Sequence, residues 1–374
     1  MPKSEPRIPL VDLRVQHAEV AAEISAGIAR ACERGEFIGG SAVADFERRY
    51  ATFCGTRECV GVGNGTDAIE LTLRALGVGA GDEVILPANT FIATAMAVLR
   101  IGAAPVLVDC EPRHHGIDPA AVAARIGNRT RAIIPVHLFG QMASLEALGE
   151  MAARAGVPIV EDAAQAHGAL RHGAQPGTLG VAATTSFYPS KNLGAYGDAG
   201  AVLTNDLELA RRVRALGNYG RDGHHDHVEP GFNSRLDAIQ AVVLGVKLGR
   251  LAAWNAARRA AAERYHELLG VLPEVTRPET APGNAHVWHL YVVRVPRRDA
   301  IIQRLAELGI DAGIHYALPL HLTRALAMLG HRPGDFPVAE RLASEILSLP
   351  LFPGITAEQQ QRVVGALGLA LRGE

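Results

Sequence analysis

Short apolar segments alternate with helix-like segments through the first two-thirds of the chain. The apolar segments have the length and composition of buried strands and lie at residues 59–62, 83–87, 105–109, 132–136, 157–160, 182–187 and 200–204. Most are separated by stretches that carry apolar residues at helical spacing. Because this alternation is typical of a parallel sheet with helices on both faces, we predict an α/β fold. Its large domain would hold a mostly parallel, seven-stranded sheet flanked by helices.

The pattern changes in the last part of the chain, beyond a proline-containing linker. Residues 287–295 alternate apolar and polar side chains, which indicates an antiparallel strand. A helix at 299–308, a strand at 311–316 and two late helices would complete a smaller C-terminal α/β domain. We therefore predict a large domain with an N-terminal arm at residues 1–248 and a small domain at residues 249–374.

Composition and charge exclude several classes of function. The 374 residues carry a formal net charge of -2, so no electrostatic argument favours nucleic acid or an anionic membrane. The four cysteines form no C-x-x-C pair, and the histidine-rich residues 224–227 match no zinc pattern, so we expect no metal. No apolar run is long enough to cross a bilayer, and the N-terminus lacks the apolar segment of a signal peptide. The cytoplasm is the expected location.

A glycine-rich turn follows the first predicted strand and opens a helix. The run Gly61-Val62-Gly63-Asn64-Gly65-Thr66-Asp67 would direct free backbone N–H groups and the positive helix end toward an anion such as a phosphate. It is not a dinucleotide fingerprint, because Thr66 occupies the sixth position of G-x-G-x-x-G, which argues against a nicotinamide oxidoreductase. An ordinary helix start, in which Thr66 or Asp67 only caps backbone amides, has the same pattern.

Polar and aromatic side chains follow two further strands. Asp162 and Gln165 come directly after the strand at 157–160, at the sheet edge where α/β proteins bind ligands. A carboxylate there could hold the ring nitrogen of pyridoxal phosphate (PLP) in its cationic form. Phe91 follows the strand at 83–87 and could cover a flat ring, although a phenylalanine at helical spacing is also a common core residue.

Lys191 is one of three lysines in a chain whose other basic residues are arginines. It lies in an apolar, small-residue run after the strand at 182–187 and is followed by glycines. Lysine, unlike arginine, can lose its proton when its surroundings desolvate it, so Lys191 is a candidate nucleophile. A lysine that only extends its amine to solvent at a strand end is the alternative.

Seven short motifs occur in one order along the chain. They are Asn64-Gly65-Thr66-Asp67-Ala68, Thr90-Phe91-Ile92-Ala93-Thr94, Pro135-Val136-His137-Leu138, Glu161-Asp162-Ala163-Ala164-Gln165-Ala166-His167-Gly168, Ser186-Phe187-Tyr188-Pro189-Ser190-Lys191, Asn233-Ser234-Arg235-Leu236-Asp237 and Gly313-Ile314-His315-Tyr316. With them the chain resembles the DegT/DnrJ/StrS sugar aminotransferases, a fold-type I PLP family, from about residue 8 to the C-terminus.

The resemblance implies roles around the cofactor PLP. Lys191 would bind PLP covalently and then move a proton between the substrate carbon and the cofactor. Asp162 would pair with the ring nitrogen, Gln165 would contact the ring hydroxyl, and Phe91 would stack on the ring. The residues implied to bind the phosphate are Gly65, Thr66, Asp67 and Ser186.

The resemblance also implies a homodimer with shared active sites. Asn233 would reach into the site of the neighbouring subunit, and the residues implied to face a nucleotide-sugar substrate are Tyr219, His315 and Tyr316. L-Glutamate would be the amino donor. The run at residues 192–198 is similar to that of the branch that acts on 3-keto sugars, so the expected acceptor is a dTDP-linked 3-keto-6-deoxyhexose of an antibiotic or surface-glycan pathway.

Three alternatives remain beside this interpretation. A 4-keto nucleotide sugar would be the substrate of a branch that more often carries Thr-Thr-Gly-Glu after the lysine. A PLP-dependent sugar dehydratase would have histidine where this chain has Lys191. A non-catalytic regulator of the same family is disfavoured by the complete set of acid, glutamine, serine and lysine.

Overall fold

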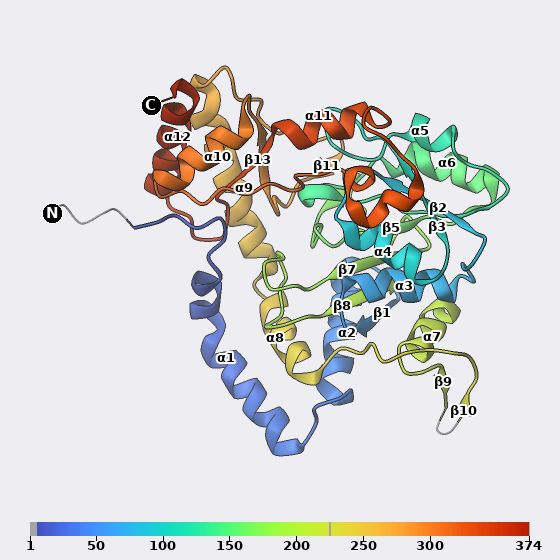
Figure 1. Ribbon diagram of the computed structural model, residues 1–374. Coiled ribbons are helices and arrows are strands. Elements are labelled where there is room, and N and C mark those ends of the chain that lie inside the picture. The colour runs from blue at the N-terminus through green and yellow to red at the C-terminus, as the bar shows by residue number, and fades with distance from the viewer. Residues whose placement is uncertain (1–5, 224–225, 374) are drawn as a thin grey trace.

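The computed structural model describes residues 6–223 and 226–373 (Figure 1). His224 and His225, part of the histidine-rich stretch considered above, lie outside the described residues. The chain opens with two helices, α1 (Leu13–Arg34) and α2 (Gly40–Cys54). Asp12 caps α1, because its side chain accepts the backbone N–H of Arg14, an amide at the helix start that has no partner within the helix.

The main sheet contains the seven predicted strands. They are β1 (Glu58–Val62), β2 (Glu83–Pro87), β3 (Ala104–Val108), β4 (Thr130–Ile133), β5 (Val160–Asp162), β7 (Ala182–Ser186) and β8 (Gly200–Thr204). Hydrogen bonds give the orders β1-β8-β7-β5 and β4-β2-β3. Parallel bridges from Ile133 to Ile159 and from Val136 to Asp162 join the two sets. Only β8 runs antiparallel to its neighbours β1 and β7, so the prediction of a mostly parallel sheet is confirmed.

Helices cover both faces of this sheet. Their bounds are α3 (Gly65–Ala75), α4 (Ile92–Arg100), α5 (Pro119–Ala123), α6 (Leu145–Ala155), α7 (Leu207–Leu216) and α8 (Ala238–Leu248). In β2 the neighbouring side chains of Val84, Ile85 and Leu86 are all buried, yet Ile85 belongs to one apolar cluster and the other two to a second. A central strand that is buried on both faces reads as a continuous apolar run, which is why the sequence revealed it.

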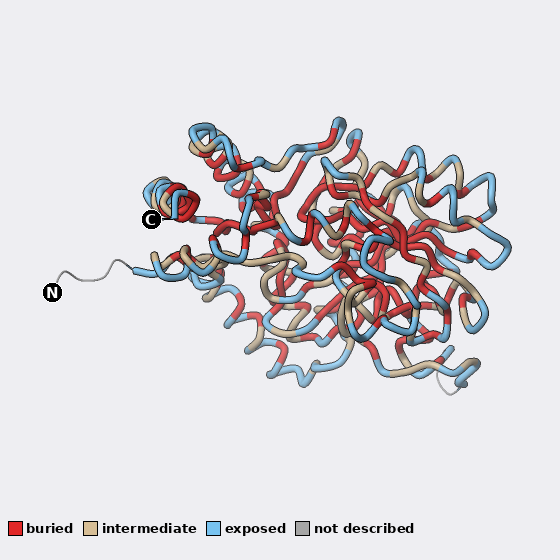
Figure 2. Tube along the Cα trace, turned by 45° about the horizontal axis from the view of Figure 1, so that its top comes forward, coloured by how far each residue is buried: buried red, intermediate tan, exposed pale blue. Residues whose placement is uncertain are grey.

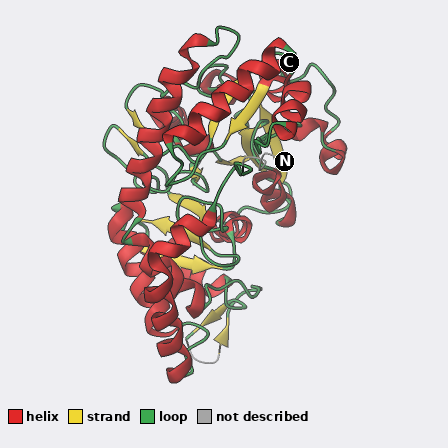
Figure 3. Ribbon diagram, turned by 90° about the vertical axis from the view of Figure 1, so that its left-hand side faces the viewer, coloured by secondary structure: helices red, strands yellow, loops and turns green. Residues whose placement is uncertain are grey.

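The C-terminal part forms a second, smaller layer. It contains α9 (Leu251–Leu268), β12 (Tyr291–Arg294), α10 (Arg298–Glu307), α11 (Pro337–Glu345), β13 (Ile346–Leu349) and α12 (Ala357–Arg372). Strands β12 and β13 pair antiparallel in a two-stranded sheet of their own, and Figure 3 shows strands close to the C-terminus. Short elements complete the fold: β6 (Leu170–Arg171), β9 (Arg221–Asp222), β10 (Asp226–His227), β11 (Asn284–Ala285) and the 3-10 turns η1 (Leu138–Gly140), η2 (Leu269–Val271), η3 (Leu320–Leu322) and η4 (Arg324–Leu329).

Two predictions for this part need correction. The strand expected at 311–316 is wrong, because this segment makes only an isolated bridge, from Gly313 to Ser348. The strand expected at 287–295 is shorter than predicted, because Trp288 adopts a positive φ of 49° and breaks the extended chain before β12.

Helices α8 and α9 follow each other with a break at residues 249–250, and Figure 1 shows α9 leading from α8 toward the C-terminal elements. The predicted domain boundary falls at this break and stays a prediction. Figure 2 shows the buried residues concentrated inside the main sheet layer and again near the C-terminus. Within the described ranges, no helix combines the length and the apolarity needed to cross a membrane.

Candidate active site

Lys191 lies in the loop between β7 and β8, at the edge of a cavity of about 680 Å³. The loop is held by its own backbone, since Lys191 N–H donates to the carbonyl of Tyr188 (2.8 Å). It is also held from α8, where the buried amine of Lys247 donates to the carbonyl of Gly194 (2.7 Å). The catalytic candidate therefore sits on a loop fixed from two sides.

The surroundings of Lys191 favour the neutral amine. Burial lowers the pKa of Lys191 to about 8, and the negative charge of Asp162 opposes that shift. A lysine of ordinary pKa is almost wholly protonated near neutral pH, whereas at a pKa of about 8 roughly a tenth of the amine is free at pH 7. The geometry thus favours a nucleophilic lysine over a solvated one.

Asp162 ends β5 and points its carboxylate into the same cavity. The hydroxyl of Thr94 donates to its Oδ2 (2.8 Å), and the backbone N–H of Ala164 donates to its Oδ1 (3.2 Å). The hydroxyls of Thr94 and Thr90 are 3.2 Å apart, so a short chain of buried hydroxyls on and before α4 holds the acid in place.

Gln165 connects the main sheet to the C-terminal part. Its Oε1 accepts the backbone N–H of Phe139 (2.6 Å), and its Nε2 donates to the Tyr316 hydroxyl (3.0 Å). The ring of Tyr316 lies 5.3 Å from that of Phe91, measured between centroids, and both rings line the cavity. Two aromatic side chains therefore stand together in the cavity wall, an arrangement that suits a flat ligand ring.

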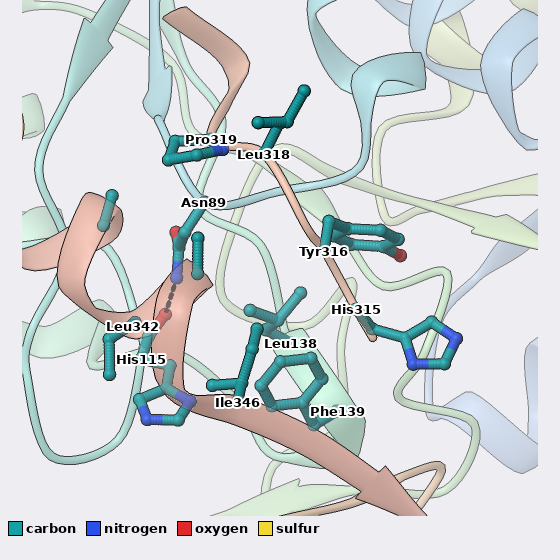
Figure 4. A pocket seen from close by; sticks show the side chains of 12 residues that line it. Asn89, His115, Leu138, Phe139, His315, Tyr316, Leu318, Pro319, Leu342 and Ile346 are labelled. Atoms are coloured by element: carbon teal, nitrogen blue, oxygen red, sulfur yellow. Dashed lines mark hydrogen bonds between the residues drawn. The ribbon is translucent and has the colours of Figure 1, made fainter. Parts of the chain in front are cut away.

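Behind Tyr316 the contact between the two parts of the chain is tight. Figure 4 shows Tyr316 and His315 on one segment, opposite Asn89, whose Nδ2 donates to the His115 carbonyl (2.9 Å). The pocket there holds only about 10 Å³ and shares His315 and Tyr316 with the lining of the larger cavity. His315 is fixed by Ser348, whose hydroxyl lies 2.8 Å from its Nδ1, and burial lowers the pKa of His315 to about 4.

An anion cradle forms where α3 begins. The backbone of Gly65 packs against Ser186 so closely that a Cβ on Gly65 would lie 2.7 Å from the Ser186 Cβ. Gly200 on β8 similarly faces the backbone of residues 64 and 65. This packing brings the Ser186 hydroxyl, Gly65 and Thr66 to one wall of the cavity, at the positive end of a helix.

Asp67 does not line the cavity, and its expected contact with the phosphate stays a prediction. Its backbone N–H donates to Oδ1 of Asn64 (2.9 Å), the helix cap, so that amide is already used. Its carboxylate accepts the hydroxyl of Ser234 (2.8 Å) and pairs with Arg100 (3.0 Å). These contacts hold the side chain of Asp67 at the start of α3.

Tyr219 and Asn233 also lie outside the cavity of their own chain. They are held together, because residues 218 and 233 form an antiparallel bridge and Tyr219 N–H donates to the carbonyl of Phe232 (3.2 Å). Tyr219 is half exposed. Their predicted roles toward cofactor and substrate stay predictions, including the expected contribution of Asn233 to a neighbouring subunit.

The cavity wall includes residues to which the sequence analysis gave no role, among them Thr94, Arg100, Tyr188 and His289. Thr94 lies one helical turn after Thr90 in a motif already singled out, so its spacing was a usable signal. His289 comes from the segment before β12 and carried no signal, because its place depends on how the C-terminal part folds back. Among the described residues, no group of three or more His, Cys, Asp or Glu is arranged to hold a metal.

The model of the DegT/DnrJ/EryC1/StrS aminotransferase family matches residues 18–368. The chain belongs to this family. The resemblance that the seven motifs indicated is thereby confirmed.

Individual family members are similar over nearly their whole length. A dTDP-3-amino-3,4,6-trideoxy-alpha-D-glucose transaminase from Streptomyces venezuelae is 46% identical, over 97% of this chain and 96% of its own. The crystal structure of S. venezuelae DesV in complex with a ketimine intermediate superposes with a TM-score of 0.95 at 46% identity, covering 98% of this chain and 99% of that one. NtdA from Bacillus subtilis with bound cofactor PMP has a TM-score of 0.88 at 31% identity, covering 95% of this chain and 82% of that one.

Proposed function

We propose that this family member is a PLP-dependent enzyme that transfers an amino group from L-glutamate to a nucleotide-linked keto-deoxysugar. The observation that carries the proposal is one cavity that combines Lys191, of lowered pKa, with the buried Asp162 and the anion cradle at Gly65 and Ser186. These groups fit PLP, because the cofactor needs an amine, an acid for its ring nitrogen and an anion site for its phosphate. When bound, PLP supplies an electron sink for the carbon that carries the amino group.

The chain's own residues then have distinct tasks. Lys191 would hold the cofactor and, once displaced by the donor amine, take and return a proton at the substrate carbon. Asp162, oriented by Thr94, would keep the ring nitrogen protonated. The start of α3 and the Ser186 hydroxyl would bind the phosphate.

For the acceptor we propose a dTDP-linked 3-keto-6-deoxyhexose, which places the enzyme in an antibiotic or surface-glycan pathway in the cytoplasm. The support is the run at residues 192–198 and the similarity to a transaminase whose name specifies a 3-amino sugar. A cavity of about 680 Å³ is large enough for the cofactor and for the sugar part of such a substrate.

We propose a homodimer with shared sites as the active form. The support is that Tyr219 and Asn233 lie together on one surface of the chain and outside its own cavity. A mixed dimer tests this directly. Lys191→Ala and Asn233→Ala chains, each inactive alone, should regain part of the activity when mixed, since one of the two sites then has both residues. If no activity returns, the sites are not shared through Asn233.

The test of the chemistry is an absorbance scan of the protein with PLP, before and after excess L-glutamate. We expect a near-visible band of the lysine-bound cofactor, absent in Lys191→Ala, that converts to the PMP band with glutamate. Adding a dTDP-3-keto-6-deoxyhexose should restore the first band, whereas restoration by a 4-keto sugar alone would reassign the acceptor. A band indifferent to all amino donors would refute an aminotransferase.

A further inference from the structure

A buried imidazole in the wall of the cavity that holds Lys191 has no role in the chemistry described so far. His289 lines the cavity and is 6% exposed. We propose that His289 is a positioning residue for Lys191, whose amine donates a hydrogen bond to the imidazole Nε2. This inference rests on the aminotransferase function proposed above and extends it to a residue that sets the direction of the lysine lone pair.

A chain of amides determines which nitrogen of His289 carries the proton. The Asn192 Nδ2 group donates to Asn255 Oδ1 (2.9 Å) and to the Val287 carbonyl (3.0 Å), which uses both of its hydrogens. Asn255 is oriented in turn, because its Nδ2 donates to the His167 carbonyl (2.8 Å). The remaining Asn192 oxygen can only accept, so His289 Nδ1, 3.2 Å away, is the donor. Nε2 therefore carries a lone pair, and none of the hydrogen bonds among described residues reaches it.

The backbone around His289 is held in a strained conformation. Trp288 has a positive φ of 49°, a backbone conformation that is unfavourable for a residue other than glycine. Arg258 is fully buried without a carboxylate partner among the described residues, and it donates to the carbonyls of Trp288 (3.2 Å), His289 (3.4 Å) and Leu351 (3.1 Å). Gly140 completes the fit, since a Cβ there would lie 2.7 Å from His289 N. A strained bend fixed by a buried cation indicates that the position of His289 matters.

The charges around His289 keep it neutral. Burial, followed by the positive charges of Lys191 and Arg258, lowers its pKa well below the ordinary value, and the neighbouring His315 and His167 act in the same direction. Asp162 is the acidic group that faces Lys191. Because the ring is neutral and its proton is on Nδ1, the Nε2 atom of His289 can accept a hydrogen bond from an amine but cannot donate one.

This polarity suits a lysine that must use its lone pair. When the amine is not bonded to the cofactor, an acceptor holds one of its hydrogens and leaves the lone pair free to attack or to take a proton. A donor at the same place would occupy the lone pair and block it. The hydrogen bonds of Asn192, Asn255 and Arg258 thus hold His289 so that its Nε2 can accept from Lys191.

The test uses two substitutions of His289 in the full-length protein with PLP. His289→Leu removes the acceptor and adds no polar atom, whereas His289→Gln places an oxygen near the position of Nε2. We expect the rate of the L-glutamate half-reaction, followed by stopped-flow absorbance, to fall roughly three- to tenfold or more in the leucine variant, as the loss of one hydrogen bond predicts. The glutamine variant should recover part of this loss, and the Kd for glutamate should change little in either.

A second measurement does not depend on turnover. The cofactor-free protein should capture PLP with a pH midpoint that is lower in His289→Leu than in the wild type, because the Lys191 ammonium loses its acceptor. His321→Leu is the matched control: it removes another buried imidazole, bonded to Glu340 (3.0 Å), away from the cavity. It should leave both the half-reaction and the midpoint unchanged.

Three results would overturn the inference. One is a glutamate half-reaction at wild-type rate in His289→Leu. Another is a defect confined to the sugar half-reaction, which would place a substrate hydroxyl at Nε2. If His289→Leu does not fold, the inference would be overturned by a His289→Gln variant whose glutamate half-reaction is as slow as that of Lys191→Ala. A wild type that shows no response to glutamate would instead refute the proposed function itself.

Discussion

The hydroxyl of Thr94 offers the sharpest test of how the site is organised. It donates to Asp162 Oδ2 over 2.8 Å, and both residues are buried, at 1% and 6% exposure. Thr94→Val keeps the shape of the side chain and removes the hydroxyl. We expect the carboxylate of Asp162 to lose its fixed orientation toward the position of the cofactor ring nitrogen.

The magnitude follows from the type of bond that is lost. A hydrogen bond to a charged group is worth about 1.5–3 kcal/mol, roughly one to two powers of ten in an equilibrium or rate constant. The hydroxyl of Thr90, 3.2 Å from that of Thr94, touches Asp162 only through it. Thr90→Val should therefore weaken cofactor binding and the glutamate reaction by only about 0.5–1.5 kcal/mol, the range for a neutral hydrogen bond.

The assay is a PLP titration by absorbance together with kcat for the glutamate reaction. Thr72→Val is the control, because this buried threonine bonds only to the Ala68 carbonyl within α3 (2.7 Å) and is absent from the cavity wall. We expect the order Thr94→Val, Thr90→Val, Thr72→Val in decreasing loss of cofactor affinity and turnover. Equal values for all three, or a larger effect at Thr90 than at Thr94, would refute the reasoning.

Three further predictions concern stability, pH and the cradle. Glu161→Gln should lower the free energy of unfolding by roughly 1–3 kcal/mol in urea denaturation, because both carboxylate oxygens accept from N–H donors: Oε2 from the Nε2–H of His137 and Oε1 from the backbone of Gly177 and Gly180. In either orientation the new NH2 group would face a donor. Capture of PLP by the cofactor-free protein should accelerate as pH rises through about 8, where the Lys191 amine loses its proton. Gly200→Ala should weaken PLP binding in an absorbance titration, since its Cβ would lie 2.8 Å from Gly65 N and displace the helix start.

Each of these predictions has a control or a contrary outcome. Glu150→Gln, at an exposed position, should leave urea denaturation unchanged, and an equal effect there would remove the argument for the buried pair. Capture of PLP that does not change between pH 7 and pH 9 would contradict a lowered pKa. Gly149→Ala introduces a Cβ that meets nothing within 4 Å inside α6, so it should not affect PLP binding.

Most of the main sheet could be predicted because its strands are buried on both faces. The consecutive apolar side chains of β2 are the clearest case. Lys191, Asp162 and Gln165 were also accessible to sequence reasoning, because residues that follow parallel strands meet at one edge of a sheet. Strand order was not accessible in this way, and the single antiparallel strand β8 has the same apolar pattern as its parallel neighbours.

What could not be predicted depends on contacts between distant segments. The carboxylate of Asp67 is one example, because Arg100 and Ser234 contact it from other segments of the chain. His289 enters the cavity only because Trp288 bends the chain sharply before β12. Helix and strand periodicity do not encode such bends, since they arise from tertiary packing.

The wide separation of the cavity residues along the chain has a thermodynamic consequence. Its wall runs from Asn64 to Tyr316, so the unfolded chain has no such site to offer a ligand. A ligand that binds only the native state raises the free energy of unfolding, by about 2.7 kcal/mol at a concentration one hundred times its Kd. Cofactor supply can therefore mask mildly destabilising substitutions anywhere in the molecule, and such variants would lose function first in cells that are short of PLP.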